Sequence, residues 1–67
     1  MNLFTWPVGD VKETVNLNHV IKIVWEQDKA IMYLFGDMKA VVAGDKHIND
    51  LCKALGWKRD MEGNIRP

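Results

Sequence analysis

The sequence predicts a small α+β domain in which an antiparallel sheet of three to five strands is followed by one amphipathic helix. Two observations lead to this prediction. Between Val20 and Ala43, three β-prone runs are separated by the short polar turns QDK and GD, a spacing typical of an antiparallel meander. After Gly44 the apolar residues change from the twofold alternation of a strand to the 3.6-residue period of a helix.

The chain begins with two shorter runs that predict an N-terminal hairpin. NLFTW is β-prone and ends at Pro7, and VGD follows as a turn. VKETVNL then alternates apolar and polar residues, which indicates a strand with one solvated face. With the three central runs, this hairpin gives the strand order expected for a meander.

The run AIMYLFG, which begins at Ala30, is unusual because it is apolar up to its final glycine. An alternating pattern would indicate one wet face, so this run indicates a strand that is covered on both faces. Its side chains divide into two sets, Ile31, Tyr33 and Phe35 on one face and Ala30, Met32 and Leu34 on the other. The sequence leaves open which set meets the helix.

The helix is predicted over about residues 45–55. Its apolar face is spaced i, i+3, i+4, i+7 and consists of Ile48, Leu51, Cys52 and Leu55. Asp45 is the expected N-cap, and Gly56 is placed to end the helix in the left-handed conformation. We expect one domain over residues 1–57, and a polar C-terminal tail or short hairpin over 58–67.

Composition limits the function classes. The 67 residues carry nine basic and nine acidic side chains and 48% apolar residues, so net charge provides no attraction to nucleic acid or anionic lipid. Cys52 is the single cysteine, which excludes a disulfide within the chain and favours a cytoplasmic location. No apolar run approaches a membrane span. A domain this small is marginally stable alone. Of the usual ways to stabilise a small domain, the composition allows association with a partner chain.

One short helix covers one face of a sheet, so the second apolar face needs the N-terminal hairpin or another subunit. We therefore expect a homo-oligomer. Trp6, an aromatic residue beside a proline near one end, is the best single candidate for a contact with another chain. The interface candidates are Trp6, Ile31, Tyr33, Phe35, Met32 and Leu34.

Residue types that carry chemistry are sparse. His19, His47 and Cys52 lack the paired spacing of a zinc site. Cys52 lies on the apolar face of the helix, where a thiol is buried and inert. The glycines are isolated, so no phosphate-binding loop is present in the sequence. We predict no catalytic residue, no metal ligand and no cofactor.

Residues 15–56, from VNLNHVIKI through two strands to a short amphipathic helix, form a β-β-β-α pattern. This pattern resembles a half-repeat of LytTR-type DNA-binding domains, and also small stand-alone proteins of the flagellar or swarming-motility type. LytTR-type domains carry basic and hydroxyl residues just before this stretch, which help to contact DNA. Here DVKET contains the acids Asp10 and Glu13, so the resemblance carries over no DNA-binding residue.

The functional prediction is a non-enzymatic protein–protein interaction module that binds itself and an unidentified protein, as accessory factors and inhibitors from bacteria or phages do. A sheet-based nucleic-acid-binding domain is the first alternative, and it predicts an affinity that falls steeply with salt. An oligomeric small-ligand binder, with its pocket between subunits, is the second.

Overall fold

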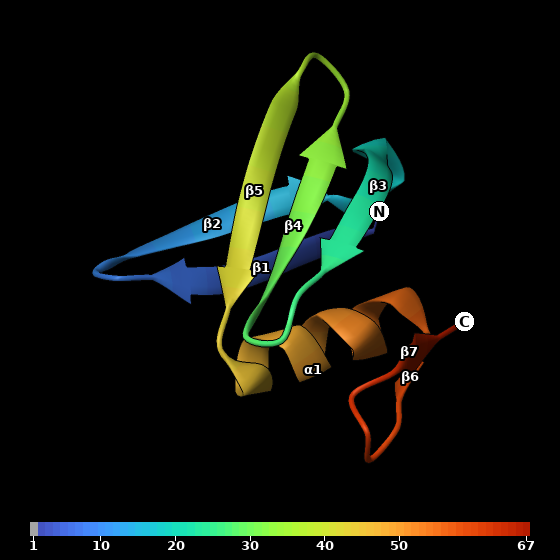
Figure 1. The fold of residues 1–67 in the computed structure, drawn as a ribbon. Helices are drawn as coiled ribbons and strands as arrows, with labels where there is room; N and C mark the ends of the chain where they lie inside the picture. The colour runs from blue at the N-terminus through green and yellow to red at the C-terminus, as the bar shows by residue number, and fades with distance from the viewer. Residues whose placement is uncertain (1) are drawn as a thin grey trace.

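Residues 2–67 are described by a computed structural model. In chain order the elements are β1 (Leu3–Val8), β2 (Val11–Asn16), the 3-10 helix η1 (Leu17–His19), β3 (Val20–Trp25), β4 (Lys29–Leu34), β5 (Met38–Ala43), α1 (Asp45–Leu55), β6 (Lys58–Arg59) and β7 (Ile65–Arg66) (Figure 1). The predicted α+β class and the helix over 45–55 are confirmed. Five strands precede the helix, as expected, and two short strands follow it.

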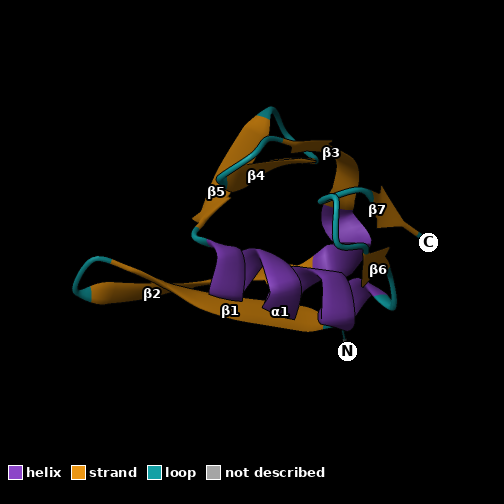
Figure 2. Ribbon diagram, turned by 60° about the horizontal axis from the view of Figure 1, so that its bottom comes forward, coloured by secondary structure: helices purple, strands orange, loops and turns teal. Residues whose placement is uncertain are grey.

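The strands form three separate antiparallel ladders: the β1–β2 hairpin, the β3-β4-β5 meander and the β6–β7 hairpin. The β1–β2 hairpin crosses one side of the meander, and α1 lies at the end of the space between them (Figures 1 and 2). Both large covering elements therefore lie on the same face of the three-stranded sheet. We call this covered side the inner face and the opposite side the outer face.

The register of the meander assigns side chains to the two faces. Ala30 pairs with Val42 and Met32 with Ala40, whereas Ile31 pairs with Val41. Ala30, Met32 and Val42 are fully buried, so the even-numbered residues of β4 and β5 make the inner face. On β3, a register shift between Val20 and Lys22 interrupts the alternation and leaves Ile21 exposed.

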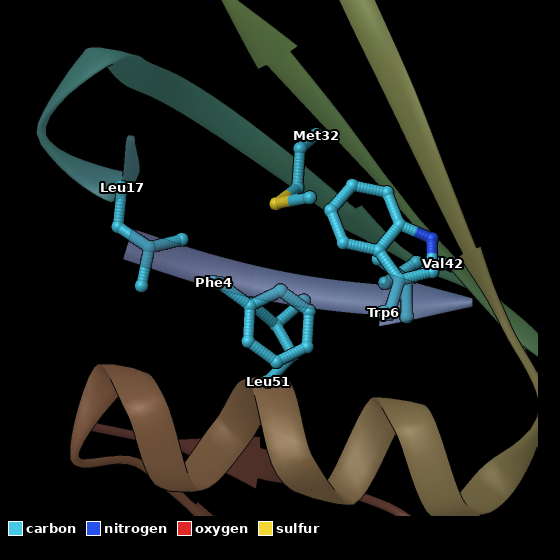
Figure 3. Packing of buried hydrophobic residues seen from close by; sticks show 7 residues of the cluster. Phe4, Trp6, Leu17, Met32, Val42 and Leu51 are labelled. Carbon is cyan, nitrogen blue, oxygen red and sulfur yellow. The ribbon is translucent and has the colours of Figure 1, made fainter. Parts of the chain in front are cut away.

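The core fills the space between the inner face, the β1–β2 hairpin and α1 (Figure 3). The buried cluster contains Phe4, Trp6, Leu17, Ala30, Met32, Val42 and Leu51. Phe4 and Trp6 are two residues apart on β1, so they point the same way, and their rings stack at 5.5 Å. The indole Nε1 of Trp6 donates a hydrogen bond to the Val41 carbonyl of β5 at 3.1 Å.

This arrangement corrects the prediction for Trp6. A Trp beside a proline near one end of the chain suggested an exposed contact residue, but Trp6 is only 2% exposed. The hairpin folds across the sheet and carries the side chain into the core. Trp6 is therefore a core residue that joins β1 to β5, and it is not available to another chain in this fold.

The ends of α1 match the sequence prediction at one terminus only. Gly56 takes the left-handed conformation, with φ of 74°. Its N–H bonds the Lys53 carbonyl and that of Trp57 bonds the Cys52 carbonyl, which is a Schellman motif. At the other end Gly44 is the N-cap, and Asp45 is the first helical residue, where its negative charge still favours the helix dipole. Within residues 2–67, no helix is long and apolar enough to cross a membrane.

Of the two alternatives predicted for the last residues, a polar tail or a short hairpin, the structure shows the hairpin, formed by β6 and β7. Arg59 on β6 reaches α1, where it donates to Asn49 Oδ1 at 3.2 Å and pairs with Asp45 Oδ1 at 3.5 Å. The ring of Trp57 lies 6.0 Å from that of Trp25 on β3. These contacts hold the β6–β7 hairpin beside the helix.

Candidate functional site

The outer face of the β3-β4-β5 sheet is a surface that neither the β1–β2 hairpin nor α1 covers. The register divides its side chains into three rows that run across the strands. The apolar row contains Val24, Ile31 and Val41. The aromatic row contains Lys22, Tyr33 and Lys39. The mixed-charge row contains Lys29 and Ala43. Glu26, one residue past the end of β3, is placed beside Lys29 by the hydrogen bond from its backbone N–H to the Lys29 carbonyl and by the ion pair between the two side chains.

The apolar row lies at the centre of the outer face. Val24 is 38% and Val41 40% exposed, and Ile31 between them is half-buried. Single exposed apolar residues are ordinary on protein surfaces, but three in one row on adjacent strands form a continuous strip. This strip has flat β-geometry and is bordered by polar rows, as a small interaction surface is.

The aromatic row lies toward the β4–β5 turn. The Nζ of Lys22 is 4.7 Å from the centre of the Tyr33 ring, within range of a cation–π interaction. On the other side, Lys39 pairs with Tyr33 in the ladder. Tyr33 thus presents a half-buried ring between two cations.

The mixed-charge row lies toward the β3–β4 turn. The Nζ of Lys29 is 3.5 Å from Oε2 of Glu26, and both side chains are partly exposed. Such a pair contributes little to folding stability in solvent, although its charges gain strength where a contact surface excludes water. One side of the apolar row therefore carries the opposite charges of Glu26 and Lys29, and the other side carries two positive charges, Lys22 and Lys39.

The predicted interface candidates separate into three groups. Ile31 and Tyr33 lie on the outer face, as the sequence pattern indicates. Phe35 was expected beside them, but it lies past the end of β4, in the turn, where the alternation of faces stops.

Met32 and Leu34 form the second group, on the inner face, and Trp6 is the third, in the core. Met32 is fully buried in the cluster with Phe4 and Trp6, and Leu34 packs against that cluster. The face of Met32 is therefore the one covered by the N-terminal hairpin and the helix. Met32 has no exposed surface to offer to a second subunit.

Phe35 in the β4–β5 turn and Met38 at the start of β5 border a separate groove of about 460 Å³ between that turn and β2. Phe35 is 69% exposed, and its backbone N–H bonds the His19 carbonyl at 3.1 Å. The opposite wall includes Glu13 and Thr14. This groove is open and lies where the two hairpins diverge.

A second cleft, of about 530 Å³, lies between the β3–β4 turn and the C-terminal hairpin, and its lining includes Trp25, Asp45 and Arg59. Arg59 is already bound to Asp45 and Asn49. In residues 2–67, no three His, Cys, Asp or Glu side chains gather as metal ligands.

Cys52 is the group whose protonation the structure alters. Burial among apolar side chains raises the pKa of the Cys52 thiol, and the nearby positive charge of Arg59 partly opposes this effect. A raised pKa leaves less of the reactive thiolate at neutral pH. The Cys52 thiol therefore acts as a buried packing group on the apolar face of α1.

Comparisons with known proteins provide no relative. The chain matches no protein-family model, and the searches of curated proteins and of solved structures give no match. The resemblance of residues 15–56 to LytTR-type half-repeats stays a prediction.

Sequence reasoning missed the lysines and the glutamate that give the outer face its pattern. Lys22, Lys29 and Lys39 all lie on this face, whereas the inner positions of the same strands carry no charge. Comparing the charged positions of all three strands, in register, would have identified the covered face. The apolar run of β4 considered alone carries no such signal.

Proposed function

We propose that this protein is a small, non-enzymatic protein–protein interaction module that assembles with itself through the outer face of its three-stranded sheet. The observation that carries the proposal is the uncovered apolar row of Val24, Ile31 and Val41. Both large covering elements, the hairpin and the helix, are used on the inner face. No described element remains to cover the outer one.

The shape and composition of the outer face support a protein partner. An apolar centre with a polar border is the usual anatomy of a protein interface. Tyr33 contributes an aromatic group with few rotatable bonds, a residue type enriched among energetically important contacts. Because the net charge of the chain is zero, two copies do not repel each other through their net charge.

The buried environment of the single thiol supports a non-enzymatic role. Enzyme sites concentrate groups whose pKa is tuned toward reactivity, and the pKa of the Cys52 thiol is moved the other way, by burial. Every residue of the described core is apolar or a thiol. We infer a cytoplasmic module, because the sole cysteine is kept as a buried, reduced thiol, and an accessory role of the bacterial or phage type.

The proposal is tested by the mass of the protein in solution as a function of concentration. Sedimentation velocity or light scattering is expected to show a mass that rises from the 7.7 kDa of one chain toward a multiple of it. Val24→Glu places a charge in the apolar row and is expected to shift the protein toward the monomer.

Val11→Glu is the matched control, since Val11 is an equally β-branched, exposed residue at the tip of the β1–β2 hairpin. It is expected to leave the mass unchanged. A mass of one chain at every concentration would contradict self-assembly, and an equal effect of both substitutions would exclude the outer face as the site. Circular dichroism checks that each variant is folded.

One feature favours a second candidate function, binding of single-stranded nucleic acid. A ring between two lysines on an open sheet provides stacking together with phosphate contacts. This function predicts retardation of a labelled oligonucleotide at low salt, lost as salt increases and lost in Tyr33→Ala. If the Tyr33→Ala variant bound the oligonucleotide with the affinity of the wild-type protein, a role for this ring would be contradicted.

A further inference from the structure

We propose that the outer face is covered by a second copy of this chain, with the strands of the two facing sheets antiparallel and with Lys22 of each copy opposite Glu26 of the other. This inference rests on the proposed self-assembly and specifies its geometry. It identifies the occupant of the face, the symmetry axis and the residues that select the arrangement.

The first step is to decide whether a second copy binds to the outer face of the sheet or to one of its edge strands. The outer strands of the sheet are β3 and β5, and a new strand could in principle pair with either. The bulge between Val20 and Lys22 distorts β3, and such bulges oppose edge pairing. On β5, the Val41 carbonyl already accepts the indole hydrogen bond from Trp6. Face-to-face packing is the contact that both edges leave available.

The second step concerns symmetry. Two copies that meet through the same face are related by a twofold axis lying in the plane between the sheets. If the axis runs along the strands, β3 of one copy faces β5 of the other, and each row meets itself. If the axis runs across the strands, β3 faces β3, the apolar row meets itself, and the aromatic row meets the mixed-charge row.

The third step is the choice between these two arrangements by charge. With the axis along the strands, Lys22 of each copy lies opposite Lys39 of the other, which brings like charges together twice. With the axis across the strands, Lys22 lies opposite Glu26. Like charges held together in a contact oppose association, whereas opposite charges favour it. The pattern of the outer face therefore selects the antiparallel arrangement.

The remaining residues of the two polar rows fit this choice. Tyr33 of one copy lies opposite Lys29 of the other, which allows a cation–π contact between copies. Lys39 lies opposite the small side chain of Ala43, along which its aliphatic stem can extend. The aromatic and mixed-charge rows are each two residues, about 7 Å, from the apolar row, so they come into register when the apolar rows meet.

The size of the face sets the strength of the dimer. Three strands of six residues span about 20 Å along the strands and about 10 Å from β3 to β5. Such a face is smaller than the roughly 800 Å² per partner of a standard interface. We expect a weak, rapidly reversible dimer that is populated only at high protein concentration.

Cross-linking provides one test of the arrangement. In a Cys52→Ala background, Val24→Cys is expected to be linked to its own copy by a bifunctional maleimide that spans about 10 Å, the separation of packed sheets. In the alternative arrangement, in which the axis runs along the strands and the facing strands are parallel, Val24 lies opposite Val41. Efficient linkage would then need a mixture of Val24→Cys and Val41→Cys chains. Linkage of the mixture alone would overturn the antiparallel arrangement.

Charge reversal provides the decisive test, because the two arrangements predict opposite signs. Lys22→Glu faces Glu26 in the antiparallel dimer and should weaken association about tenfold or more, since the contact occurs twice. In the parallel dimer it faces Lys39 and should strengthen association. Glu26→Lys alone should also weaken the antiparallel dimer, and the double variant Lys22→Glu/Glu26→Lys should restore the wild-type dissociation constant to within about threefold.

Lys12→Glu, on β2 and away from the outer face, is the matched control and should leave the dissociation constant unchanged. Wild-type protein that stays monomeric at every concentration would overturn the proposed self-assembly itself. A wild-type dimer that is weakened by Val24→Glu, but whose Lys22→Glu variant is unaffected or strengthened, would leave self-assembly standing and overturn the antiparallel arrangement. The experiment is sedimentation equilibrium of these six proteins, Val24→Glu included, across a concentration series.

Discussion

The inner face of the β3-β4-β5 sheet carries more apolar residues than the outer face, and the two faces have opposite environments. Residues 30, 32 and 42 on the inner face are fully buried, whereas Val24 and Val41 on the outer face are more than one-third exposed. The inner positions are apolar throughout, and the outer positions place charges on both sides of one apolar row. The comparison shows that the positions of the charges, together with the number of apolar residues, separate the covered face from the uncovered one.

The largest effect is expected from shortening the centre of the inner face. Met32→Ala removes a fully buried side chain and should lower the free energy of unfolding by about 2–5 kcal/mol. Ile31→Ala, the adjacent residue on the outer face, should cost about 1 kcal/mol or less in the monomer. Urea denaturation at a concentration where the chain is monomeric measures both, and equal costs would contradict the assignment of faces.

The next effect concerns the contact between the hairpin and the sheet. Trp6→Phe keeps an aromatic ring but removes the donor to the Val41 carbonyl, which leaves that carbonyl without its indole partner. We expect a loss of about 1–3 kcal/mol. The same substitution at half-buried Trp57 should cost less, and a larger loss there would show that the C-terminal hairpin carries more of the stability than β1 does.

A smaller effect is expected at the end of the helix. Gly56→Ala places a Cβ at a φ of 74° and should cost about 1 kcal/mol. Gly56→Asn should cost less, because Asn tolerates the left-handed conformation. Thermal unfolding compares the two variants, and an equal loss for both would argue against backbone strain as the cause.

The smallest effect is the pH dependence that comes from Cys52. Burial raises the pKa of this thiol above the ordinary value of 9.0, so above about pH 9 the folded state holds a proton that the unfolded state releases. The contribution is complete below that pH and is lost as the pH rises through the folded-state pKa. Urea denaturation between pH 8 and 10 should show stability falling, with a flatter profile in Cys52→Ala.

Much of the fold can be predicted from local sequence patterns. The meander, the N-terminal hairpin and the helix end at Gly56 each depend on residues close together in the chain, such as turn residues and apolar periodicity. These signals act within one element or between neighbours. For that reason the element order is predicted well, and the N-cap differs from the prediction by one residue.

The placement of elements against one another is not encoded in such patterns. Trp6 becomes buried because its hairpin crosses the sheet, and its hydrogen-bond acceptor is 35 residues away. Phe35 leaves the outer face because the strand ends one residue earlier than its apolar run. The two faces are distinguished by comparing Lys22 on β3 with Lys39 on β5 through their common partner Tyr33 on β4, and that comparison needs the register of all three strands.

The hydrogen bond from Trp6 to Val41 has a consequence for how the chain reaches its native state. The meander can form from neighbouring segments, but its inner face is completed by β1 from one side of the sequence and by α1 from the other. Contacts that span such separations slow the search for the folded state. A chain on the ribosome that has emerged only as far as β5 still lacks Leu51 of α1, so the buried cluster is incomplete, and chaperones recognise the apolar surface of incomplete cores. We expect the emergence of α1 to be the event that ends this vulnerable period of synthesis.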